Sequence, residues 1–125
     1  MKNNKLKDEF LIKEICRVLE ISYLDFLRNQ KQRYVLGRYL FAFLAKKHDS
    51  KRTLKSIGNV LNLHHATVLH AFRAIETYIQ LNTKIDGVNV KQLVKTINSS
   101  SEIETKPIEN VFGYAALNKR KALLV

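Results

Sequence analysis

The chain has 125 residues, 46% hydrophobic and 26% charged, which is the size and composition of one soluble globular domain, and its one Pro and four Gly favour helices. The single cysteine excludes an intramolecular disulfide, and neither a signal peptide nor an apolar stretch of the roughly 18 residues that cross a bilayer occurs, so we expect a cytoplasmic protein. With 22 Lys and Arg against 11 Asp and Glu, the net charge of +11 predicts a polyanionic partner.

The first expected element is an amphipathic helix over residues 8–20. Leu11 and Ile15 lie on its apolar face, and Cys16 joins the same pattern as an expected core residue. Ser22 then has the position and chemistry of an N-cap, so we expect it to cap the short helix YLDFL.

The next predicted helix runs from Tyr34 to Lys47, after the basic stretch RNQKQR, because Leu and Phe recur there at helical spacing. Gly37 lies inside this helix at a cost of about 1 kcal/mol relative to Ala, which predicts a close helix contact at this position. Thr53 is expected to cap the following helix, from Leu54 to Leu61.

Residues 54–79 have the pattern of a helix-turn-helix. Gly58 lets the second helix cross closely, Asn62 takes the turn position that usually needs positive φ, and Val68 anchors the second helix in the core. Leu63 is expected to fill the core beneath the turn. Asn62 lies four residues after Gly58 and Val68 lies ten after it, which is the common spacing. The pattern predicts that the second helix binds double-stranded DNA in the major groove.

The outward face of the second helix follows from these core positions. His65, Ala66 and Thr67 are expected nearest the base edges, because the first residues of a recognition helix enter the major groove and their side chains suit base contacts. His70 and Arg73 lie farther along the helix, where we expect contacts with the DNA backbone.

Positive charge is concentrated between Arg28 and Arg73, where ten basic residues and one acid, Asp49, leave a net charge of +9. Each phosphate that a basic side chain neutralises releases condensed counterions, so this segment predicts binding to the backbone of a nucleic acid. The residues expected on this ground to contact phosphate or the minor groove are Arg28, Lys31, Arg33, Lys51, Arg52 and Lys55.

The C-terminal third begins with a predicted turn at Asp86-Gly87. Asn89 and Gln92 then resemble a capping box that opens a short helix. The linker-like composition that follows divides the chain into a helical DNA-binding domain at residues 1–98 and a linker with a C-terminal tail at residues 99–125. A docking segment, a final helix and a disordered end remain alternatives for the tail.

The segment HHATVLHAFRAIE resembles the signature of the C-terminal DNA-binding domain of the bacterial chromosomal replication initiator DnaA. His65, Thr67 and the run from Val68 to Ala71 match that signature. LEISYLDFLRNQKQR and GRYLFAFLAKKH resemble the preceding helix, basic loop and long helix, so the resemblance covers roughly residues 8–80. It implies an all-α, Trp-repressor/DnaA domain IV-like helical bundle with the helix-turn-helix in the major groove and the basic loop in the adjacent minor groove.

By this resemblance, His65 and Thr67 contact bases, and Arg38 and Lys46 approach phosphate. Five departures bear on which sequence is read. His64 stands where the family has an acidic residue, Ala66 replaces the first Thr, and Leu63 stands near the usual Arg. The turn is one residue shorter, and Gln30 falls where the family has its minor-groove Arg. DNA binding as a class survives these changes. His64 and Ala66 are therefore kept as base-contacting candidates, and Gln30 as a minor-groove candidate.

An enzyme is not expected. No G-x-x-x-x-G-K-[ST] phosphate loop and no G-x-S-x-G nucleophile elbow occur, so neither an ATPase motor nor this class of nucleophilic catalysis is predicted. His64, His65 and His70 cluster in sequence, but no Cys or carboxylate completes a zinc ligand set, and neither a metal nor a cofactor is expected.

The chain is interpreted as a stand-alone DNA-reading module without the motor, acting in replication initiation or its control, or in transcription regulation. A phage or a mobile element is one interpretation of its source. An RNA-binding protein is a first alternative, for which Tyr34 and Tyr39 are the aromatic candidates near the basic loop. An adaptor or decoy that acts on a host replication initiator and docks a protein partner through the C-terminal tail is a second.

Overall fold

The structure, a computed structural model, describes residues 4–105 of the chain and the side chains of residues 7–99. Its elements in chain order are helix α1 (Asn4–Leu19), the 3₁₀ helix η1 (Tyr23–Asp25), α2 (Gln32–His48), α3 (Leu54–Leu61), α4 (His65–Gln80), strands β1 (Lys84–Ile85) and β2 (Val88–Asn89), and α5 (Val90–Thr105). The expected all-α bundle with a helix-turn-helix is confirmed, and one short hairpin is added to it.

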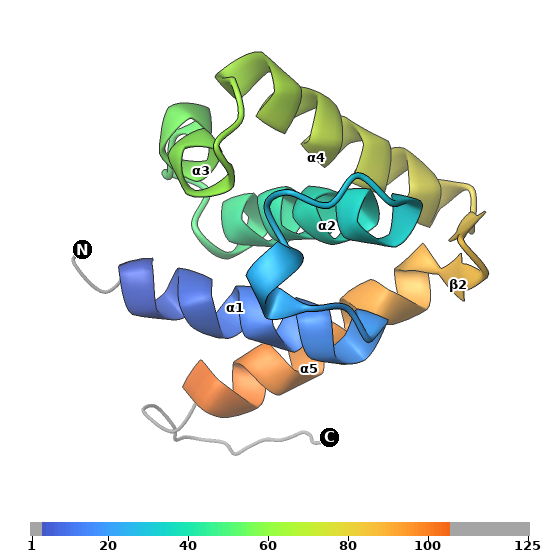
Figure 1. Cartoon of the computed structure of the whole chain (residues 1–125). Helices are drawn as coiled ribbons and strands as arrows, with labels where there is room; N and C mark the ends of the chain where they lie inside the picture. The colour runs from blue at the N-terminus through green and yellow to red at the C-terminus, as the bar shows by residue number, and fades with distance from the viewer. Residues whose placement is uncertain (1–3, 106–125) are drawn as a thin grey trace.

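Helix α2 is the centre of the fold. It lies between the α3–α4 pair on one side and helices α1 and α5 on the other (Figure 1). Because neighbours cover it from several directions, it is apolar around most of its circumference, and every residue from Leu40 to Ala45 is buried. Leu11, Ile15 and Cys16 of α1 are buried as expected. Burial raises the pKa of the Cys16 thiol to about 11, so this cysteine stays protonated in the core.

The connection between α1 and α2 differs from the sequence-based expectation. The predicted helix YLDFL is a single 3₁₀ turn, and Ser22 precedes it without a side-chain capping bond. The Ser22 N–H instead donates to the Tyr34 hydroxyl at 2.9 Å. Gly37 was predicted to allow a close contact with another helix. The close contact exists, but it is with the segment that connects α1 and α2. A Cβ there would lie 3.1 Å from Phe26 Cε1 and 3.3 Å from Ile21 Cδ1.

The turn predicted at Asp86-Gly87 is confirmed, and it closes a hairpin in which β1 and β2 pair antiparallel. Asp86 has φ 53° and Gly87 has φ 78°, which are the positive angles that a two-residue hairpin loop of this kind requires. The strands have two residues each, too few for an alternating pattern to predict them. The Asn89 side chain accepts from Gln92 N–H at 3.0 Å. This is the bond that the Asn contributes to the expected capping box of α5.

Helix α5 is longer than expected. Val90, Leu93, Val94 and Ile97 are buried, and the helix continues to Thr105, past the point where the linker was expected to begin. Residues 106–125, on which most of the predicted tail falls, lie outside the described part of the chain.

Candidate nucleic-acid interface

The helix-turn-helix has the local bonds that its sequence predicts. The Thr53 hydroxyl accepts from Ser56 N–H at 3.0 Å and caps α3. Ile57, Leu61 and Val68 are fully or almost fully buried and join α3 and α4 through one core. The apolar contacts therefore fix the angle at which α4 leaves the turn.

The turn itself depends on Asn62 and Gly58. Asn62 is left-handed, with φ 60° and ψ 43°, as predicted. Its N–H and that of Leu63 both donate to the Gly58 carbonyl, the latter at 2.8 Å. The expected role of Gly58 needs correction. A Cβ there would collide with the Leu63 carbonyl oxygen, whereas Val68 of the second helix would lie at an ordinary 3.4 Å. Glycine is therefore required at this position mainly by the backbone of the turn, and less by the close approach of the second helix.

Asn62→Gly is expected to be neutral or mildly stabilising, because Gly reaches the left-handed region without a Cβ clash. Asn62→Val is expected to be clearly destabilising, by roughly 1–2 kcal/mol, because a β-branched residue resists that region. Thermal unfolding of both variants measures the order of stability. A Val variant more stable than the Gly variant would contradict the left-handed turn.

The start of α4 presents the residues predicted to contact bases. His64 is the N-cap, and its Nδ1 accepts from Ala66 N–H at 3.1 Å. With Nδ1 used as an acceptor, a neutral His64 carries its proton on Nε2 and has that donor available to a ligand. The rings of His64 and His65 stack with centroids 4.2 Å apart. His65 and Ala66 are exposed, and Thr67 is half-buried beside them.

The capping role of His64 was not predicted, although its position directly before the helix is the signal that indicates it. His70 and Arg73 are exposed farther along α4, as expected for backbone contacts. The His70 ring packs edge-on against Tyr39 of α2, with centroids 5.8 Å apart.

The predicted backbone-contacting residues fall into two groups. Six of them are exposed around the helix-turn-helix and in the basic loop between η1 and α2, in addition to His70: Arg28, Gln30, Lys31, Lys51, Lys55 and Arg73. The side chains of the other four, Arg33, Arg38, Lys46 and Arg52, bind other parts of the protein.

Arg38, expected to approach phosphate, is only 6% exposed. Its Nη1 donates to the Phe26 carbonyl at 2.7 Å and to the Asn29 carbonyl at 2.9 Å. Burial lowers the pKa of the Arg38 guanidinium below its ordinary value. Arg38 therefore shapes the start of the basic loop, and its approach to phosphate stays a prediction.

Arg52 forms a buried ion pair with Asp8 of α1. Two parallel hydrogen bonds of 2.7 and 2.8 Å join them, and Arg52 Nε donates to Ser56 Oγ at 3.0 Å. Lys46 donates to the carbonyls of Ser50 and Arg52. Arg52 and Lys46 thus hold the connection between α2 and α3, and their phosphate contacts stay predictions.

Asp8 was missed, although helical spacing places it on the same face as Leu11, Ile12 and Ile15. A carboxylate on a buried face needs a cationic partner, and that is the signal that indicates such a pair.

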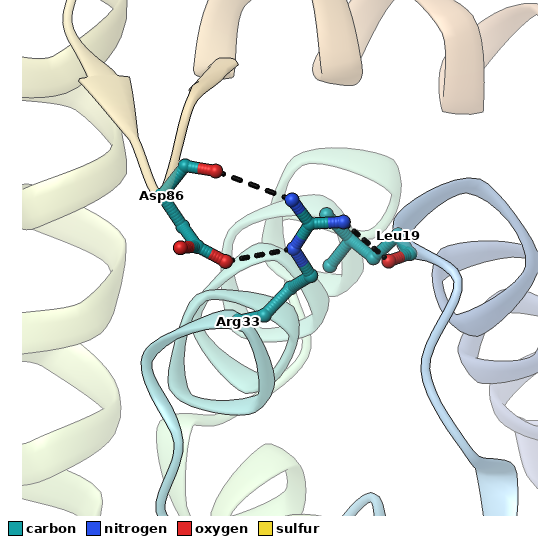
Figure 2. A network of polar contacts seen from close by, with 3 residues as sticks. All are labelled: Leu19, Arg33 and Asp86. Carbon is teal, nitrogen blue, oxygen red and sulfur yellow. Dashed lines mark hydrogen bonds and ion pairs between the residues drawn. The ribbon is translucent and has the colours of Figure 1, made fainter.

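Arg33 is the fourth of these cations, and its side chain is 33% exposed. It pairs with Asp86 of the hairpin loop and donates to the carbonyl of Leu19 at the end of α1 (Figure 2). Arg33 is therefore engaged within the fold, and its contact with phosphate stays a prediction.

The described part of the chain holds neither a metal-binding cluster nor a membrane-spanning helix. No group of three His, Cys, Asp or Glu side chains within it is placed to hold a metal ion. Its helices include none with both the length and the apolar composition needed to span a membrane.

Comparison with known proteins shows a family to which part of this chain is similar. The family described as bacterial dnaA protein helix-turn-helix matches residues 9–75. The chromosomal replication initiator protein DnaA of Kosmotoga olearia is 27% identical over 73 residues, which are 58% of this chain and 16% of that protein. The chain therefore spans only a small part of the length of this relative. No solved structure matches. The matched residues include α2, α3 and most of α4, and the hairpin and α5 lie beyond them.

Proposed function

Because the chain belongs to the bacterial DnaA helix-turn-helix family, a DNA-binding domain, we propose that it is a non-catalytic module that reads a specific double-stranded DNA sequence. In this proposal the start of α4 enters the major groove, and the loop at residues 28–31 reaches the adjacent minor groove. The observation that carries it is the first turn of α4. There the side chains of His64, His65 and Ala66 are exposed next to Thr67, above a turn with the left-handed geometry of the motif.

The side chains at the start of α4 have chemistry suited to base contacts. His64 Nε2–H is a donor for a base acceptor, the Thr67 hydroxyl both donates and accepts, and the Ala66 methyl suits a thymine methyl. The α4 N-terminus adds the positive end of the helix dipole, which attracts phosphate. These groups can discriminate bases while the backbone of α4 positions the helix.

The exposed cations flank this helix along the chain. Lys51 and Lys55 lie just before and within α3, and Arg73 lies farther along α4. Arg28 and Lys31 lie in the basic loop, with Gln30 between them as the minor-groove candidate. In this arrangement the cations supply affinity through phosphate, and the α4 residues supply sequence discrimination.

We assign the module to replication initiation or its control. The support is the curated relative, which is a chromosomal replication initiator and of which this chain matches a small part.

The test is a selection of bound sequences from random duplex DNA, followed by substitution. His65→Ala and Thr67→Ala are each expected to cost on the order of 1–3 kcal/mol on the selected site and much less on random DNA, because a base contact is lost. Thr77→Ala is the matched control, since Thr77 is exposed at the far end of the same helix. Dissociation constants at several salt concentrations measure both effects.

Equal losses on selected and random DNA would show that His65 and Thr67 only position the backbone. Wild-type affinity should also fall steeply with salt, by a log–log slope of about 0.9 for each neutralised phosphate. Failure to enrich any sequence, or displacement of duplex DNA by structured RNA at equal concentration, would contradict sequence-specific DNA binding.

A further inference from the structure

The Arg33 guanidinium joins three elements. Arg33 lies in the first turn of α2, and its Nε donates to the Asp86 carboxylate at 2.8 Å. Nη2 donates to the Asp86 backbone carbonyl at 3.2 Å, and Nη1 donates to the Leu19 carbonyl at 3.1 Å. All three nitrogens are thus used, toward the hairpin loop and the end of α1 (Figure 2). Such a fork fixes orientation in a way that a single point charge does not.

These contacts hold the C-terminal end of the basic loop. Arg33 follows the loop residues 28–31 almost directly, and its backbone opens α2. The other end of the loop is held by Arg38, which donates to the carbonyls of Phe26 and Asn29. Inside the loop, the Asn29 side chain accepts from Lys31 N–H at 2.8 Å. The loop is therefore shaped before any ligand arrives, and a pre-shaped loop loses less conformational entropy on binding.

Asp86 is itself held in place by the hairpin. It lies in the two-residue loop with positive φ, and β1 and β2 fix both sides of that loop. At the base of the hairpin the Asn89 side chain donates to Asn82 Oδ1 at 3.0 Å. The hairpin lies beyond the family match to residues 9–75, so its carboxylate comes from a part of the chain that the match does not cover.

We propose that the Asp86–Arg33 pair positions the basic loop for DNA, and that the hairpin is a support for the DNA-binding surface. Asp86 is then an acid that strengthens binding to a polyanion without contacting it. This inference rests on the proposed function, because it assigns a positioning residue to the same interface.

The direction in which DNA affinity changes when Asp86 is replaced distinguishes a positioning role from a purely electrostatic one. Removing an acid raises the net charge, so electrostatics alone predicts that Asp86→Asn binds DNA more tightly. Loss of positioning predicts weaker binding. The variant Arg33→Lys distinguishes a positioning role of Arg33 from a direct contact with phosphate. It keeps the charge that a phosphate contact needs, but an ammonium group cannot make the three-way fork.

The experiment uses the full chain and the duplex obtained from the selection. Dissociation constants are measured over a salt series for wild type, Asp86→Asn, Arg33→Lys and the control Glu20→Gln, which removes an exposed acid next to Leu19. Amide hydrogen exchange is followed in residues 28–31 and in α4. We expect Asp86→Asn and Arg33→Lys to bind about three- to tenfold more weakly, with an unchanged salt slope because no phosphate contact is lost. Glu20→Gln should bind as wild type or slightly more tightly.

Exchange should accelerate in residues 28–31 and stay unchanged in α4, since faster exchange throughout would indicate general unfolding and contradict a local role. Tighter binding by Asp86→Asn, or wild-type affinity and exchange in Arg33→Lys, would overturn the positioning role alone. Absence of duplex binding by the wild-type chain would overturn the proposed function, and the exchange pattern would still report whether the pair holds the loop.

Discussion

Replacing Asp8 with Ala is expected to destabilise the fold by about 3–5 kcal/mol, because it leaves the buried Arg52 guanidinium without its counter-charge. The two side chains are 11% and 8% exposed and are joined by two short hydrogen bonds. Arg52 also belongs to the connection that leads into α3, so the variant should lose DNA binding as it unfolds. Urea unfolding followed by circular dichroism measures the change in free energy.

The control for this prediction is the double variant Asp8→Leu with Arg52→Met. It replaces both charges with apolar side chains, and such replacements of a buried pair are often neutral or stabilising. We therefore expect it to recover most of the stability that Asp8→Ala loses. A loss below about 1 kcal/mol for Asp8→Ala would show instead that water reaches this pair and that it behaves as a surface salt bridge.

Gly58→Ala is expected to have the second large effect. The added Cβ would collide with the Leu63 carbonyl oxygen, a backbone atom that cannot move without distorting the turn. We expect a loss of roughly 1–3 kcal/mol or more, as for other overpacked sites, although Ala is the better helix former by about 1 kcal/mol. Because the turn sets the direction of α4, DNA affinity should fall as well. Thermal unfolding and a DNA titration measure the two effects.

Gly37→Ala is the matched control, since it is also a glycine in a helix. Its nearest neighbours are side-chain atoms of Phe26 and Ile21 at 3.1 and 3.3 Å, which can shift by a few tenths of an ångström. The gain in helix propensity offsets that adjustment, so we expect a much smaller change in stability. Equal losses in the two variants would contradict the special role of the carbonyl at Leu63.

The helix-turn-helix was predictable because its determinants are close in sequence. Thr53 caps the helix that begins at the next residue, and Asn62 turns the chain within four residues of Gly58. Each of these features depends on backbone geometry and on bonds between near neighbours, for which residue type and spacing are sufficient. The hairpin turn at Asp86-Gly87 was predictable for the same reason, whereas its two-residue strands were too short to leave a pattern.

The division of the basic residues was not predictable in this way. The ten cations between Arg28 and Arg73 look alike in sequence, and nothing in their charge distinguishes those that face solvent from those that bind other parts of the protein. Arg38 and Lys46 bind nearby backbone carbonyls, which every residue carries and which leave no signal in the sequence.

Composition, helical periodicity and turn chemistry by themselves determined that this protein is an all-α, basic, helix-turn-helix module, because these properties follow from local preferences summed along the chain. Only the tertiary structure decided which cations face solvent and which support the fold. Arg33 and Arg52 find their acids 53 and 44 residues away, across the packed helices. A cationic side chain that is already bonded to a carboxylate or a carbonyl of the protein is less available to phosphate. Which cations have such a partner depends on packing between elements that are far apart in the chain.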